Sequence, residues 1–154
     1  MTRETGAANG ARDGARVVLS PDGLFDPLPF GFAQAATVET PRGVELHISG
    51  QVAWDADQNI VGEGDIGAQV EASLRNLETA LASAGATLDQ VGGLRIYIKH
   101  SHIDQGEAIS AGLKAVFGDC PPTATWIGVP SLAREEFLVE IEPSVVLLTD
   151  DRAV

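Results

Sequence analysis

The sequence predicts an α+β domain in which two helices cover one face of a mixed β-sheet. Three observations lead to this fold class: an alternating hairpin pattern around residue 45, two later segments with helical periodicity, and strand-like runs beside each of them. Along the chain the elements follow the order ββ(β)αβαββ. Because two helices hide only one sheet face, we expect the second face, also alternately apolar, to pack against copies of the chain.

Length and composition define the size of the domain and its kind of core. The chain has 154 residues and a mass of 16.1 kDa, enough for one domain. Residues 1–16 lack periodicity and predict a flexible tail, so the single domain is expected at residues 17–150. Hydrophobic residues make up 44% of the chain and aromatic residues only 5%. Aliphatic side chains must therefore fill the core, and aromatic residues gathered at a pocket would stand out.

The N-terminal third predicts a loop and a hairpin. After a short apolar piece at residues 17–19, residues 22–32 contain prolines, glycines and three phenylalanines. This composition predicts a loop packed by its aromatic rings, of the kind that often rims a pocket. Residues 35–40 and 44–52 then form a hairpin signal around a Pro-Arg-Gly turn, with polar side chains alternating against Leu46 and Ile48.

Two helices are predicted from apolar residues three and four positions apart. The first has Asp65 as its N-cap and Gly85 as the residue that ends it. A strand at residues 94–99 follows, and the spacing of Asp104 and Glu107 then resembles a capping box that opens the second helix. The apolar faces of the two helices are Ile66, Val70, Leu74, Leu77 and Leu81, and Ile109, Leu113, Val116 and Phe117.

Two more strands are expected, at residues 124–129 and 138–148. In the second of them Glu140 and Glu142 are two positions apart, which places both carboxylates on one face of an extended strand. From spacing alone a solvated strand face accounts for the pair. The alternative is that one carboxylate lines a cleft and works on a proton.

Charge and cysteine content exclude several classes of partner. Ten Lys and Arg against 22 Asp and Glu give a net charge of −12, which repels phosphate backbones, so we expect no nucleic-acid partner. No apolar run approaches the roughly 20 residues that span a bilayer, so we expect no membrane role. A single cysteine and no leader-like start favour the cytoplasm.

Other reactive side chains give weaker signals. His100 and His102 could ligate a metal, but no Cys or His cluster supports them. Cys120 has no neighbour in the sequence that would activate its thiol. The glycines of Gly62-x-Gly64-x-x-Gly67 match a dinucleotide fingerprint only formally, since no buried strand leads into them. We therefore expect no metal and no cofactor.

Several short segments together resemble one known family. They are Gly31-Phe-Ala-Gln34, Ser49-Gly-Gln51, Ala84-Gly85, Pro121-Pro122 and Val139-Glu-Ile-Glu142. In order and spacing they are similar to the Rid family, also called the YjgF or enamine/imine deaminase family, over about residues 29–148. The resemblance implies a chorismate-mutase-like fold and a homotrimer that binds a small-molecule ligand in clefts between subunits.

The resemblance also implies a set of site residues. Glu140 corresponds to the glutamate that positions or activates water in deaminase members, and Ser49 with Gly50 to the ligand-binding turn. Three positions depart from the family pattern. Ala124 stands where the family has the arginine that clamps the substrate carboxylate, Phe32 where it has a tyrosine, and Trp126 where it has a cysteine. Thr125, between the two strand positions, is also expected to contact the ligand. Arg134 could replace the lost charge only if the loop before the last strand folds back, which we do not expect.

Loss of the clamp disfavours 2-imino acids, because such a charge pair contributes about 2 to 5 kcal/mol of binding. Two functions remain: hydrolysis of an uncharged or aromatic enamine or imine, with Glu140 as acid or base, and a ligand-binding or protective module without turnover. The −12 charge disfavours a ribonuclease.

Overall fold

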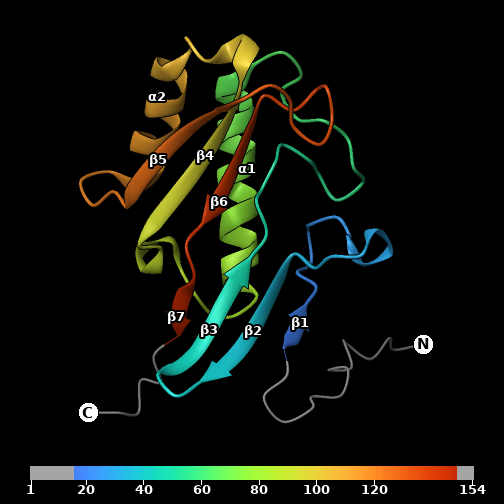
Figure 1. The fold of residues 1–154 in the computed structure, drawn as a ribbon, viewed down its shortest axis with the longest axis vertical. Helices are drawn as coiled ribbons and strands as arrows, with labels where there is room; N and C mark the ends of the chain where they lie inside the picture. Colours follow the sequence, from blue (N-terminus) through green and yellow to red (C-terminus); the bar gives the residue numbers. More distant parts are fainter. Residues whose placement is uncertain (1–15, 149–154) are drawn as a thin grey trace.

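A computed structural model of the chain describes residues 16–148 (Figure 1). Apart from Arg16, the expected tail lies outside the described residues, as do the last two positions of the expected domain. The strands are β1 (Val17–Leu19), β2 (Ala35–Thr40), β3 (Gly43–Ile48), β4 (Gly93–Lys99), β5 (Thr123–Val129), β6 (Val139–Pro143) and β7 (Val146–Leu148). The helices are α1 (Ile66–Ala82) and α2 (Gly106–Phe117), with short 3-10 turns at Leu28–Phe30, Leu88–Gln90 and His100–His102.

The strands form two sheets that share the last segment of the chain. One sheet has the order β1-β2-β3-β7 and the other β5-β4-β6, and only the β4–β5 pair is parallel. An antiparallel bridge between Gln51 and Ile141 joins them. Figure 1 shows α1 running behind the strands of both sheets, with α2 beside it. The predicted α+β class with two helices on one face is therefore confirmed.

The last strand differs from the prediction, because it is broken. Residues 138–148 were expected to form one strand, but Pro143 ends the pairing with β4, and the chain resumes as β7 against β3. Proline has no N–H to continue a ladder, so a change of partner is favoured directly after it. The hairpin strand expected to reach residue 52 likewise ends at Ile48.

The caps of α1 were predicted correctly and the start of α2 was not. Asp65 accepts a hydrogen bond from the Ala68 N–H at 3.1 Å, and the N–H groups of Gly85 and Ala86 return to carbonyls of the last helical turn. In contrast, α2 begins after Gln105 without any side-chain cap. After the preceding 3-10 turn, the backbone of the N-cap residue Gln105 is not extended, so the expected capping box of Asp104 and Glu107 does not form.

The two sheet faces have different compositions. Leu46, Ile96 and Ile141 are fully buried against the helices, as the alternation predicts. The opposite face is mixed: Glu45, His47, Arg95, Tyr97 and Glu142 lie there beside apolar residues such as Val18, Val38 and Leu147. Within residues 16–148, no helix combines the length and apolar character needed to cross a membrane.

Candidate functional site

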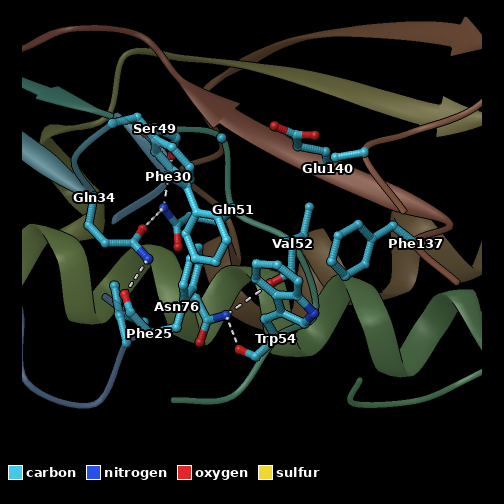
Figure 2. Close-up of a pocket in the computed structure, with 14 residues that line it drawn as sticks. Phe25, Phe30, Gln34, Ser49, Gln51, Val52, Trp54, Asn76, Phe137 and Glu140 are labelled. Carbon is cyan, nitrogen blue, oxygen red and sulfur yellow. Dashed lines mark hydrogen bonds between the residues drawn. The ribbon is translucent and has the colours of Figure 1, made fainter. Parts of the chain in front are cut away.

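A cavity of about 370 Å³ lies where the loop of residues 22–32, the segment after β3 and the start of β6 meet over α1 (Figure 2). This volume lies in the range that holds small metabolites. The loop of residues 22–32 rims the cavity, as its composition predicts. The polar lining residues are Gln34, Ser49, Gln51, Asn76 and Glu140, and the other lining residues are Leu24, Phe25, Phe30, Phe32, Gly50, Val52, Trp54, Ala133 and Phe137.

Aromatic rings form most of the wall of the pocket. Five of the eight aromatic residues of the chain lie here, four phenylalanines and one tryptophan. Phe25 is the hub, and its ring centroid lies 4.5 Å from that of Trp54 and 6.2 Å from that of Phe32, both edge to face. Trp54 in turn meets Phe137 at 5.1 Å. Edge-to-face pairs of this kind fix one another's orientation, so the wall is rigid.

Glu140 is the acidic group of the pocket. Its side chain projects from β6 and forms no hydrogen bond or ion pair within residues 16–148. Burial raises the pKa of this carboxyl above the ordinary glutamate value, and repulsion from Glu142 raises it further. The raised pKa makes Glu140 hold its proton to a higher pH than an ordinary glutamate does, which suits a group that transfers protons.

Gly50 makes room for the Glu140 side chain. A Cβ atom at residue 50 would overlap the Oε1 atom of Glu140 and lie 2.9 Å from its carboxyl carbon. Any larger residue would therefore displace the carboxylate from its present position. The position of the acid thus depends on a glycine about 90 residues earlier in the chain.

A network of amides holds the floor of the pocket. The Nε2 group of buried Gln34 donates to the Phe25 carbonyl at 3.0 Å, and that of Gln51 donates to the Ser49 carbonyl at 2.8 Å and to the Gln34 Oε1 atom at 3.1 Å. Asn76 of α1 donates to the carbonyls of Val52 and Trp54 (Figure 2). Because carbonyl oxygens only accept, these contacts fix which end of each amide is nitrogen.

The loop of residues 130–138 closes the pocket from the β6 side. Buried Gln69 of α1 anchors it, donating to the Glu136 carbonyl at 2.9 Å and accepting from the Leu138 N–H at 2.8 Å. The loop folds back far enough to place the Arg134 guanidinium carbon 5.5 Å from the centre of the Trp54 ring, contrary to the sequence-based expectation. Arg134 is not free, since it pairs with Glu136 at 3.1 Å.

Four of the predicted site residues meet in this pocket and three do not. Phe32, Ser49, Gly50 and Glu140 all line it. Ala124, Thr125 and Trp126 lie on β5, beyond β4 and exposed. The parallel register sets Ala124 and Trp126 beside residues of β4 that face the helices, and the Trp126 ring lies against Gly106 of α2. A single chain therefore does not bring β5 to Glu140.

Part of the pocket wall was not predicted, and some of the reactive side chains considered from the sequence lie outside the cavity. Trp54 and Phe137 were not identified, because Trp54 begins a segment that reads as a polar turn. The clustering of aromatics in a chain with so few of them was the signal for the whole wall. His100, His102 and Cys120 lie outside the cavity, and within the described part of the chain no three His, Cys, Asp or Glu side chains gather as metal ligands.

Comparison with known proteins gives consistent matches. The sequence model of the family described as Endoribonuclease L-PSP matches residues 32–147. A RutC family protein from Pyrococcus abyssi is 26% identical over 117 residues, which are 75% of this chain and 87% of that protein.

Solved structures agree over a similar length. A Yersinia pestis protein of unknown function from the Rid family is 38% identical with a TM-score of 0.62, covering 86% of this chain and 98% of that one. A Mycobacterium tuberculosis member of the YjgF/YER057c/UK114 family is 28% identical with a TM-score of 0.69, covering 87% and 100% of the two chains.

Proposed function

Since this chain belongs to the Rid (YjgF) family, whose sequence model is described as Endoribonuclease L-PSP, we propose that it hydrolyses the carbon–nitrogen bond of a small imine or enamine. The observation that supports this most directly is Glu140: an unpaired, half-buried carboxyl with a raised pKa, in a pocket large enough for a metabolite. Groups placed in this way are typical of proton-transfer sites.

The proposed chemistry needs only one carboxyl group and water. Protonated Glu140 gives its proton to the imine nitrogen, which makes the carbon more electrophilic. The carboxylate that results then takes a proton from water as its oxygen attacks that carbon. Glu140 then gives this proton to the nitrogen of the adduct and takes up the hydroxyl proton as the C–N bond breaks, which yields a carbonyl compound and ammonia or an amine and leaves Glu140 protonated.

The proposed substrate lacks a carboxylate. Among the described residues that line the pocket there is no Lys, Arg or His, and the nearest guanidinium, that of Arg134, is paired with Glu136. A 2-imino acid would lose the charge-assisted contact that its carboxylate requires. The aromatic wall instead favours an apolar or aromatic body.

We also propose that the protein is a homotrimer in which β5 of one copy completes the cleft of the next. The exposure of Ala124, Thr125 and Trp126 supports this, since β5 is an open edge with a tryptophan 42% exposed. Analytical ultracentrifugation tests the assembly, and a monomeric protein would remove β5 from the site.

The alternative is a ligand-binding or protective module without turnover, which the missing arginine favours. The ribonuclease activity in the family description is disfavoured for this chain. The pocket has no basic lining residue among those described, and the net charge of −12 repels RNA.

The test compares two ways of generating imines. A flavin-dependent amine oxidase acting on an aromatic amine supplies imines without a carboxylate, and an amino-acid oxidase supplies 2-imino acids. We expect the protein to accelerate ammonia release from the first source and not from the second. Glu140→Gln should lower the rate by at least about 100-fold, the usual size of an acid–base contribution.

Glu78→Gln is the matched control, because it removes an exposed carboxylate of α1 outside the pocket. Circular dichroism and sedimentation confirm that both variants are folded. Full activity of Glu140→Gln would exclude Glu140 as the catalytic group. Absence of turnover with every imine, together with ligand binding, would favour the module.

A further inference from the structure

We propose that the pocket selects its ligand as a cation, a protonated nitrogen with N–H donors carried on an apolar or aromatic body. In the proposed function this cation is the iminium that forms once the imine nitrogen has taken the Glu140 proton, and a bound amine is the ammonium form. This preference for a cation rests on the proposed function only in taking this pocket as the ligand site. Three independent features of the pocket support it: its rings, its unused hydrogen-bonding atoms and its charge.

The rings provide surfaces that attract positive charge. An aromatic face carries negative electrostatic potential, and several faces around one cavity hold an organic cation well. Phe25, Phe30, Phe32, Trp54 and Phe137 line this cavity. Trp54 already accepts a guanidinium within the chain, that of Arg134 at 5.5 Å.

Most of the side-chain atoms that the protein leaves unused are acceptors. The amide nitrogens of Gln51 and Asn76 each donate to two oxygen atoms, one N–H of Gln34 donates to the Phe25 carbonyl, and the Ser49 hydroxyl donates to the Ala33 carbonyl at 2.6 Å. Within residues 16–148 the amide oxygens of Gln51 and Asn76 have no partner, and neither has the Glu140 carboxyl.

Among the described residues the Trp54 Nε1 group also has no partner, and it is buried. A ligand therefore finds more side-chain acceptors than donors, the donors being the second N–H of Gln34 and the Glu140 hydroxyl when that carboxyl holds its proton. An N–H-bearing nitrogen satisfies these oxygens, whereas a carboxylate would add more unpaired acceptors.

The charge of the site acts in the same direction. Glu140 is the one ionisable group among the described lining residues, and it is an acid. The whole chain carries −12, so the long-range field also draws cations towards the cavity. Negative charge spread over the whole surface attracts cations everywhere, so the test must distinguish binding in the pocket from binding to the acidic surface.

The experiment is isothermal titration calorimetry of the intact protein with three phenyl compounds of similar size. These are 2-phenylethylamine as the cation, 2-phenylethanol as the neutral analogue and phenylacetate as the anion. We expect the cation to bind at least about ten-fold more tightly than the alcohol, and the anion most weakly. Equal binding of cation and alcohol, stronger binding of the anion, or no binding of any of the three would overturn the proposal.

Variants locate the binding. Phe30 is 61% exposed at the cavity rim, so Phe30→Leu removes a ring with little risk to folding. Phe30→Leu and Glu140→Gln should each reduce the preference for the amine over the alcohol several-fold. Phe117→Leu on α2, outside the cavity, is the matched control and should leave that preference unchanged.

If the pocket variants bind the amine as the parent protein does, the cation binds elsewhere on the acidic surface and the inference is wrong. The measurement uses no turnover. The preference can therefore hold in a protein that does not hydrolyse imines, and it can fail in one that does.

Discussion

The two ends of β6 contain the same residue type on the same sheet face in opposite electrostatic conditions. Glu142 accepts a hydrogen bond from the Tyr97 hydroxyl at 2.6 Å and pairs with Arg95 at 3.4 Å. Glu140, two residues earlier, has neither kind of partner within the described residues and faces aromatic rings. The first carboxylate is compensated by its neighbours, and the second is only desolvated.

On the proposed function, one strand thus carries both a structural acid and a reactive one. The partners of Glu142 contribute to stability, whereas burial makes Glu140 bind its proton more tightly. The hydrogen bond from Tyr97 to Glu142 also raises the pKa of the Tyr97 hydroxyl, because ionised oxygen cannot donate it. Each of the following changes tests whether the two ends are separate in this way.

The largest effect is expected from Gly50→Ala. The added methyl group pushes the Glu140 carboxyl out of its position, so turnover should fall by about 100-fold, as if the acid were removed. Gly50 does not have a positive φ, so its backbone accepts alanine. Steady-state kinetics with the imine that the protein hydrolyses measures the loss.

Gly92→Ala is the control for this substitution, since its new methyl group would meet only the Ser144 hydroxyl, at 3.9 Å. It should retain the parent rate. Equal rates for Gly50→Ala and Gly92→Ala would mean that the position of Glu140 does not matter for catalysis.

Tyr97→Phe should affect the other end of the strand. It removes the hydrogen bond to Glu142 and should lower the free energy of unfolding by about 1.5 kcal/mol, the lower end of the range for a bond to a charged group, because this bond is only partly buried. Turnover should not change, because Tyr97 does not line the pocket. Urea denaturation measures the stability. A large loss of activity without a loss of stability would contradict the idea that the contacts of Glu142 serve stability and not turnover.

The smallest effect is expected in the pH dependence of stability. The pKa of Glu140 is raised in the folded protein, so its contribution is fully present below the ordinary value of 4.5 and is lost as pH rises through the raised pKa. The Glu140→Gln variant has no ionisable group at this position. The difference between its free energy of unfolding and that of the parent protein should therefore increase in its favour across this pH range and stay constant at higher pH.

Urea denaturation at a series of pH values measures this difference. Glu142→Gln removes the repulsion that contributes to the raised pKa of Glu140. The pKa of Glu140 in the folded protein should therefore fall, and the pH range over which the stability changes should end at a lower pH. A stability difference between the parent protein and Glu140→Gln that does not vary with pH would mean that the Glu140 pKa is ordinary.

Most of the fold was predictable because its elements have strong local patterns. Both ends of α1 follow from single residues, Asp65 and Gly85, whose roles depend only on neighbouring backbone. The proline at position 143 could have predicted the break in the last strand. The strand with which the chain pairs afterwards depends on distant residues near position 45. The start of α2 depends on a preceding turn and has no cap signal of its own.

The site was less predictable, because contacts distant in sequence create it. Glu140, Ser49 and Gly50 were identified by resemblance to a family, while their spacing alone allowed a solvated strand. The approach of Arg134 to Trp54 needs the loop of residues 130–138 to be fixed by Gln69, which no short pattern reveals. The single chain leaves the three predicted β5 positions beyond β4, away from Glu140.

The broken last strand has a consequence for synthesis on the ribosome. The segment after β3 forms one wall of the pocket and leaves the ribosome about 90 residues before the wall that carries Glu140. The segment that contains β6 and β7 emerges last, and it also joins the two sheets. Pairings between such distant residues form slowly and only once both are available. A nascent chain of this protein therefore has no complete pocket until β6 emerges, and a transcript truncated before β6 yields neither the wall with Glu140 nor the bridge that joins the two sheets.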